Sequence, residues 1–342
     1  MSDTIRIDLL SHAHHLNQPL TGFYSLAKKD GMKLEIRDCS QSAEYAIKKT
    51  ALVAYLDDRR LVYDMADGYQ SPKAMEYLLN RCDAYFKRSF SDETNREMGY
   101  SNVYPYGLNY DVTWLGNPLL RSRYTSIARF AKGLLNGAMI SPSAIETKPD
   151  VARKNRLRSP KILYMVRLWP EDPALSEQEN EERRTINEQR IRLIRAIKRG
   201  FGDRLMGGVA DNKLARAIAP DLIMPRMLTN RNAYLQIMKR TKICIATTGL
   251  HGSIGGKLGE YVAASRAIVS EPLRYSVPGD FLPKKNYLEF DTIDGCLRQI
   301  DWLLEKPERI MEIQNNNCQY YRRYLEPERM IRNTLSAIGI EK

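Results

Sequence analysis

The residues with the clearest chemical potential lie in Thr247–Leu273, TTGLHGSIGGKLGEYVAASRAIVSEPL. Its first half combines five glycines, at positions 249, 252, 255, 256 and 259, with His251, Lys257 and Glu260. Glycine lets the backbone approach a ligand closely, and the free N–H groups at the start of a helix favour an anion. Lys257 and Glu260 are three residues apart, so on a helix they share a face. The pattern predicts an anion-binding turn between a strand and a helix.

The spacing of these glycines matches neither of two common phosphate-binding motifs. GxxxxGK[ST] and GxGxxG both place their glycines differently. A simpler interpretation therefore stays open, in which the glycines only let the helix pack on the sheet while Lys257 and Glu260 are solvated.

The elements around this stretch alternate between strand and helix. The pattern predicts strands at 162–168, 203–210, 242–249 and 267–272, and helices at 177–200, 230–240 and 256–265. Strands separated by helices imply a parallel sheet covered by helices on both faces. Ligands of such sheets bind beyond the carboxyl ends of the strands, which is where the glycine stretch begins.

The first half of the chain predicts a second α/β unit. We expect strands at 5–11, 33–39 and 84–90, a strand pair within 51–63, helices at 20–31 and 71–82, and a mostly irregular loop over 91–116. Apolar residues are scarce in 146–160, ETKPDVARKNRLRSP, which we interpret as a linker. A length of 342 residues also favours two domains. We therefore predict a first domain over 1–155, a second over 156–320, and a helical segment over 321–342.

With this order of parts, the chain resembles the C-terminal half of group 1 glycosyltransferases of the GT-B fold, over roughly 161–335. In that family a glycine-bearing loop covers the diphosphate of a nucleotide sugar, and the next helix carries a glutamate that binds the ribose hydroxyls. The resemblance assigns Ser253, Gly255 and Gly256 to the loop and Glu260 to the ribose. Arg167, near the end of ILYMVRL, takes the position of a basic residue that contacts the donor phosphates.

The resemblance implies a fold and a reaction. The fold would be α/β, with two Rossmann-like domains facing across a cleft and C-terminal helices crossing back to the first domain. The reaction would move a hexose-like sugar from a nucleotide-sugar donor to a glycan or lipid-linked acceptor, in cell-surface polysaccharide assembly. It would need no metal and no cofactor beyond the donor, because Arg167, Lys257 and backbone amides would stabilise the departing diphosphate.

The sequence departs from the family pattern at one position. Many retaining members carry two glutamates eight residues apart, but Gly252 stands eight residues before Glu260, so the stereochemical outcome stays open. His251 lies beside this gap and is a candidate contact for the phosphates or the sugar. As a loop residue it can equally be solvated.

An inverting mechanism would need a base from the first domain. The candidates are His15, in a loop that also holds His12 and His14, and Asp67 in YDMADGY. Each also has a plain interpretation, as part of a solvated loop or an ordinary turn.

The net charge of +12 indicates an anionic partner. Nucleic acid is disfavoured because no zinc finger, RNP strand or KH loop is recognisable. Basic residues over 153–161 and 183–204 can form a solvated helix face, or they can bind an anionic lipid surface, which would place the protein peripherally on the inner face of the plasma membrane. Five cysteines without close pairs or metal-like spacing favour reduced thiols, a cytoplasmic setting and no metal site.

Two other functions remain open from the sequence. One is a nucleotide-sugar epimerase on the same fold, because its donor site would look alike. The other is a non-catalytic basic binding protein, which the missing first glutamate favours.

Overall fold

The computed structural model describes residues 3–42, 45, 50–69, 71–123, 131, 133, 140–149 and 161–340, without the side chains of 121–123. The chain forms two compact units. Unit 1 comprises Met1–Ala144, Arg274–Asp280 and Tyr320–Lys342, and unit 2 comprises Ile145–Leu273 and Phe281–Gln319. The boundary expected between 155 and 156 lies outside the described residues.

Unit 2 is built on a five-stranded sheet with the order β11-β10-β9-β7-β8. Every neighbouring pair is parallel. The strands are β7 (Ile162–Val166), β8 (Leu205–Val209), β9 (Ile243–Ala246), β10 (Ala267–Ser270) and β11 (Leu288–Glu289). Because β7 lies between β8 and β9, the chain leaves β7 toward one side of the sheet and later returns to its other side.

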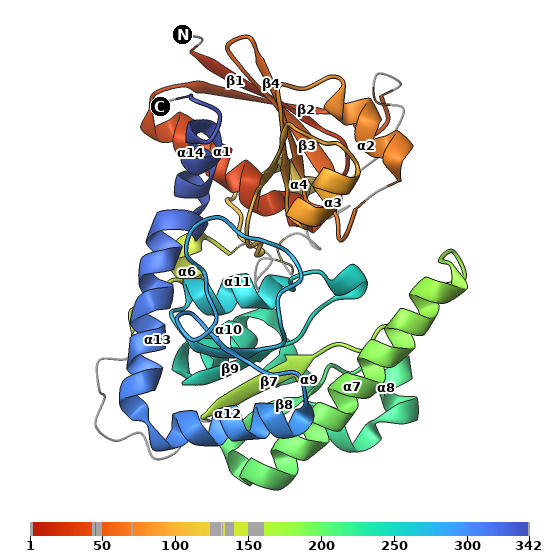
Figure 1. Ribbon diagram of the computed structural model, residues 1–342, viewed down its shortest axis with the longest axis vertical. Helices are drawn as coiled ribbons and strands as arrows, with labels where there is room; N and C mark the ends of the chain where they lie inside the picture. The colour runs from red at the N-terminus through yellow and green to blue at the C-terminus, as the bar shows by residue number, and fades with distance from the viewer. Residues whose placement is uncertain are drawn as a thin grey trace. The chain divides into compact units, whose positions relative to one another are not determined.

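Helices cover both faces of this sheet, as Figure 1 shows. One face carries α7 (Glu177–Phe201) and α12 (Ile293–Glu305), and the other carries α10 (Arg231–Arg240) and α11 (Gly256–Ala263). Ile162, Tyr164 and Val166 of β7 pack with Ile194 of α7 and Ile300 of α12 in one buried cluster. The alternate residues of β7 therefore face α10 and α11. The remaining helices of unit 2 are α8 (Lys213–Ile218), α9 (Arg226–Thr229) and α13 (Pro307–Tyr320).

Unit 1 contains a six-stranded sheet with the order β2-β1-β3-β4-β5-β6. Its strands are β1 (Thr4–Leu9), β2 (Lys33–Asp38), β3 (Ala51–Leu56), β4 (Arg59–Asp64), β5 (Ala84–Lys87) and β6 (Val103–Pro105). Only β3 runs antiparallel to its neighbours, joined to β4 by a tight turn at Asp57, whose φ is 49°. The carboxyl ends of the other five strands therefore share one edge.

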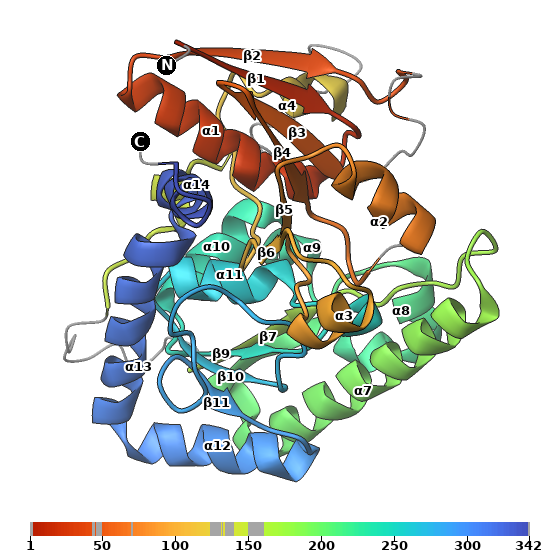
Figure 2. The same cartoon turned by 45° about the horizontal axis from the view of Figure 1, so that its top comes forward.

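The C-terminal helix belongs to unit 1, where α14 (Pro327–Ser336) lies alongside α1 (Asn17–Lys29), as Figure 2 shows. A Cβ added to Gly22 of α1 would lie 2.4 Å from the carbonyl oxygen of Pro327, so glycine permits the close approach. The hydroxyl groups of Tyr63 and Thr334 lie 2.8 Å apart and join α14 to β4. On the other face of this sheet, Met75 and Leu78 of α2 (Pro72–Leu79) pack on β3 and β4.

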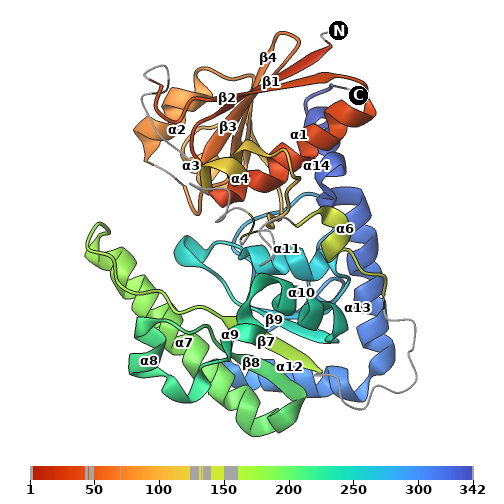
Figure 3. The ribbon, with the colours of Figure 1, turned by 180° about the vertical axis from the view of Figure 1, so that it is seen from behind.

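The predicted fold class, two Rossmann-like units with C-terminal helices that return to the first, is confirmed. The long helix α13 precedes α14, with a π-helical turn at Tyr321–Leu325 between them (Figure 3). The stretch 91–116 is mostly irregular, as predicted, but it also contains two short elements that the pattern did not predict, α3 (Asp92–Glu97) and β6. Helix α3 has the polar sequence DETNRE. Its N-cap is Ser91, whose side chain accepts a hydrogen bond from the Thr94 amide. Such a helix shows no apolar period.

Two further short helices are α4 (Pro118–Arg123) and α6 (Pro142–Ile145). Within the residues that the structure describes, no helix combines the length and the apolar character needed to cross a membrane.

Candidate functional site

The glycine stretch of unit 2 lies at the switch point of the sheet. Strands β7 and β9 are neighbours and parallel, although β8 and its helices separate them in the chain. The segments that follow β7 and β9 thus leave the same edge in opposite directions, which makes this point of the sheet a topological switch point. Ligands of open parallel sheets bind at this point, and both Arg167 and the stretch from Thr247 start there.

A tight turn connects β9 to α11. The Gly249 amide donates to the Ser253 carbonyl at 2.8 Å, and a Cβ on Gly249 would lie 2.7 Å from Ser253 Oγ. Gly252 has a φ of 64°, which disfavours other residues. Gly255 is the N-cap of α11 and supplies no capping side chain. The turn therefore needs its glycines sterically, and it presents the first turn of α11, which includes Gly256, without a side-chain cap.

Lys257 reaches from α11 back to the sheet. Its Nζ donates a hydrogen bond to the Met165 carbonyl of β7 and lies 4.9 Å from the centre of the Tyr234 ring. The pKa of Lys257 is lowered to about 8, mainly by burial and also by three nearby guanidinium groups, while the charge of Glu260 opposes them. The guanidinium groups belong to Arg190, Arg231 and Arg167. Four cationic groups thus lie around the switch point.

Glu260 lies one helical turn after Lys257 and is buried. Its Oε1 forms an ion pair with Arg231 Nη2 at 2.7 Å. Its Oε2 is buried and has no hydrogen-bond partner among the described residues. An unsatisfied buried carboxylate oxygen is costly in a folded protein, so this atom points to a ligand that donates hydrogen bonds.

The segment after β7 is held by α7. The buried Arg190 donates to the Arg167 carbonyl at 2.8 Å, and its guanidinium lies 4.2 Å from the centre of the Trp169 ring. Asn187 pairs with the backbone of Trp169 in both directions, at 2.9 and 2.8 Å. These contacts fix the backbone at Arg167, whose side chain is exposed.

His251 is placed differently from the other candidates in unit 2. Its ring lies 3.9 Å from both Glu179 and Glu182 of α7, and its amide donates to Glu182 at 2.7 Å. Its φ is 57°, in the left-handed region that few residues other than glycine adopt. The structure therefore groups Arg167, Lys257 and Glu260, with the turn Ser253–Gly256 beside them, and sets His251 against α7.

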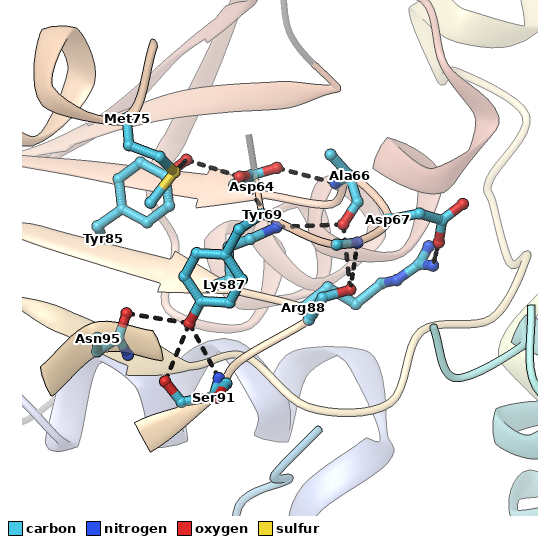
Figure 4. Close-up of polar contacts among 12 residues, drawn as sticks. Asp64, Ala66, Asp67, Tyr69, Met75, Tyr85, Lys87, Arg88, Ser91 and Asn95 are labelled. Carbon is cyan, nitrogen blue, oxygen red and sulfur yellow. Dashed lines mark hydrogen bonds and ion pairs between the residues drawn. The ribbon is translucent and has the colours of Figure 1, made fainter. Parts of the chain in front are cut away.

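In unit 1, polar side chains gather where β4 and β5 end (Figure 4). Asp64 and Lys87 are paired in the sheet register, and both side chains are completely buried, with Lys87 Nζ 3.2 Å from Asp64 Oδ2. Tyr85 also donates to Asp64 Oδ2 at 2.6 Å, and the Ala66 amide donates to Oδ1 at 2.8 Å. Lys87 Nζ also donates to the Ala66 carbonyl at 3.2 Å, so the pair holds the turn that carries Asp67.

Both catalytic candidates of unit 1 meet a residue that the sequence analysis did not select. Arg88, directly after β5, forms an ion pair with Asp67 through Nη2 and lies 3.2 Å from His15 Nδ1 through Nη1. Burial lowers the pKa of His15 to about 4, and the charge of Arg88 is the next cause. His15 is therefore neutral at physiological pH.

Several residues of these sites could not be selected from sequence. Arg88 was placed inside a strand over 84–90, but β5 ends at Lys87 and leaves Arg88 at the sheet edge. Arg190 resembled any other basic residue of an amphipathic helix, although it is buried. Arg231 has no local signal, because its partner Glu260 lies 29 residues later in the chain. Among the described residues, no three His, Cys, Asp or Glu side chains gather as metal ligands.

Comparison with known proteins gives likenesses of structure only. No family model matches the sequence, and no curated protein does. Among solved structures, TarM of S. aureus is similar with a TM-score of 0.45 and 12% identity, over 78% of this chain and 46% of the TarM chain. The present chain thus spans less than half of TarM.

Two further solved structures are similar over more of their length. A glycosyltransferase from Rickettsia africae has a TM-score of 0.44 and 12% identity, over 97% of this chain and 96% of its own. Anabaena Alr3699/HepE, in complex with UDP and glucose, has a TM-score of 0.44 and 11% identity, over 92% of this chain and 89% of its own. At these scores and identities the likenesses establish neither a family nor an activity for this chain.

Proposed function

We propose that the chain is a glycosyltransferase that binds a nucleotide-sugar donor at the switch point of unit 2. The observation that carries this proposal is the combination at one strand edge of Lys257, three arginines, and a buried carboxylate oxygen of Glu260 without a partner. A diphosphate needs cations, and a ribose offers hydroxyl donors to a carboxylate. A nucleoside diphosphate supplies both groups in one molecule.

Each residue has a role in this proposal. Lys257 and Arg167 neutralise the diphosphate, assisted by the amides of the uncapped turn Ser253–Gly256. Glu260 accepts hydrogen bonds from the ribose hydroxyls through Oε2. During transfer the bond from the anomeric carbon to the diphosphate breaks, and negative charge builds on the leaving group. The cations stabilise that charge, so the proposed transfer needs no metal ion.

We also propose that the acceptor is a glycan or lipid-linked sugar, bound by unit 1 beside His15 and Asp67. The charge of +12 supports an anionic membrane surface near the acceptor. Within α7, Arg184, Arg192 and Arg195 are ion-paired with acidic side chains, so these three arginines contribute less to such a surface. Pelleting with anionic liposomes at low salt tests this part, and no pelleting would contradict it.

Calorimetric titration with nucleoside diphosphates and with inorganic pyrophosphate tests the donor site. We expect Glu260→Gln to weaken a nucleoside diphosphate by about tenfold more than it changes pyrophosphate, the effect of roughly one charged hydrogen bond, because only the nucleotide has a ribose. The loss of the Glu260 charge beside Lys257 and Arg231 acts on both ligands and cancels in this comparison. Lys257→Met should weaken both ligands. The control is Glu188→Gln, which removes the same charge from the exposed face of α7.

The outcomes separate the three candidate functions. No binding of any nucleotide by the folded wild-type protein would refute the donor site. Binding with a change in the sugar but without an acceptor would identify an epimerase. Binding with neither reaction would leave a non-catalytic binding protein.

A further inference from the structure

The contact between Arg88 and His15 bears on which nitrogen of the His15 ring carries the proton. Arg88 Nη1 lies 3.2 Å from His15 Nδ1, and a guanidinium can donate hydrogen bonds but never accept them. Nδ1 must therefore be the accepting nitrogen in this contact. A neutral imidazole has one donor and one acceptor nitrogen, so its proton is then on Nε2.

A second contact of Nδ1 competes with this assignment. Asn109 Oδ1 lies 3.4 Å from the same nitrogen and would accept a proton from it. The amide orientation of Asn109 is fixed, because its Nδ2 donates to the His15 carbonyl at 3.0 Å and to Gln18 at 2.9 Å. The contact to Arg88 is shorter and charged, and a proton on Nδ1 would face the guanidinium directly. The hydrogen bond from Arg88 therefore decides the role of Nδ1, which accepts this bond and carries no proton.

The position of Arg88 is itself rigid. Its side chain is 5% exposed, its amide donates to the Asp64 carbonyl at 2.9 Å, and Nη2 is held by Asp67. The neighbouring Lys87 has its own partner in Asp64, so it does not compete for Asp67. The charged and titratable groups that face His15 are Arg88, His14 and Asp67.

We propose that Arg88 is a positioning residue that fixes His15 as the neutral Nε2–H tautomer, so that His15 donates a hydrogen bond to the ligand of unit 1 and is not a catalytic base. The tautomer does not depend on the proposed function, whereas the role toward an acceptor rests on it. If an inverting transfer occurs, the first-domain candidate for the base is then Asp67.

Nitrogen NMR of the ¹⁵N-labelled full-length protein tests the tautomer without any substrate. The His15 signals are assigned by their loss in His15→Gln, and we expect Nδ1 unprotonated and Nε2 protonated. The tautomer is read from the wild-type spectrum, where a proton on Nδ1 would overturn the proposal. His15→Gln serves only to assign the signals, and sequential backbone assignment replaces it if that variant does not fold. In Arg88→Met we expect mixed tautomers and a pKa nearer the ordinary value of about 6.5. Arg59→Met, at the opposite end of β4, is the control that should change neither.

Activity measurements test the role of the ring once an acceptor is known. The side-chain amide of glutamine can donate from near the position of Nε2, so we expect His15→Gln to keep kcat within about tenfold and His15→Phe to lose more. A base contributes about 10²- to 10⁴-fold, so a loss of that size in His15→Gln would show that His15 is the base. A protein that shows the predicted tautomer but has no transferase activity would leave the positioning by Arg88 intact and refute only the proposed function.

Discussion

The charge on Lys257 should control the affinity for a nucleoside diphosphate as the pH changes. The pKa of Lys257 is lowered to about 8, mainly by burial and then by the guanidinium groups of Arg190, Arg231 and Arg167 around it, against the opposing charge of Glu260. Most other lysines keep their charge well above that pH. Lys257 should therefore be the group at this site that loses its charge just above neutral pH.

The size of the effect follows from the fraction of Lys257 that is protonated. With a pKa of about 8, that fraction is about 0.9 at about pH 7 and about 0.1 at about pH 9. If the diphosphate requires the charged lysine, its Kd should weaken by about tenfold over this interval, or about 1.4 kcal/mol. Affinity is thus highest below the pKa and falls as the pH rises through it.

Calorimetric titration at several pH values measures this change, with Lys257→Arg as the matched variant. An arginine stays charged throughout, so its Kd should be flat over the same interval. Titration of the ligand itself would appear equally in both proteins and cancels in the comparison. A wild-type Kd that does not change, or the same slope in Lys257→Arg, would refute the assignment of Lys257 to the phosphates.

Three changes to the scaffold have expected outcomes that chemical denaturation can measure. Gly22→Ala should destabilise the protein by about 1–3 kcal/mol, because the new Cβ would lie 2.4 Å from the Pro327 carbonyl oxygen, whereas Gly200→Ala has open space in α7 and should stabilise it. Asp64→Asn should cost about 3–5 kcal/mol by leaving Lys87 buried without its partner, while the exposed pair of Lys33 and Glu35 should tolerate Glu35→Gln. Thr292→Ala should cost about 1 kcal/mol, because the Thr292 side chain caps α12 through the Gly295 amide at 3.0 Å. A neutral Gly22→Ala or Asp64→Asn would contradict the packing described, and an unchanged Thr292→Ala would show that water replaces the cap.

The elements of this protein could be predicted where the apolar pattern is local. The strand at Ile162–Val166 and the helix at Glu177–Phe201 both follow from the spacing of their own apolar residues and from the polar segments beside them. The short polar helix Asp92–Glu97 was missed, because it has no apolar period and depends on the Ser91 cap.

The features of the site in unit 2 also separate into those that follow from the local sequence and those that depend on long-range packing. The glycine turn before α11 and the shared face of Lys257 and Glu260 are short-range features, so the sequence alone indicated them. The strand order that puts β7 beside β9 is decided by packing over the whole unit, and it brings Arg190 and Arg231 toward Lys257.

Long-range contacts also decide the protonation of His15 in unit 1. The types of His15 and Asp67 suggested a base, but a side chain's protonation depends on burial and on charges that the fold brings near it. Arg88 is 73 residues from His15 in the chain and only 3.2 Å from it in the structure. The sequence determined which groups could do chemistry, and the tertiary structure decided which of them are charged, because only the folded chain sets their distances and their exposure to water.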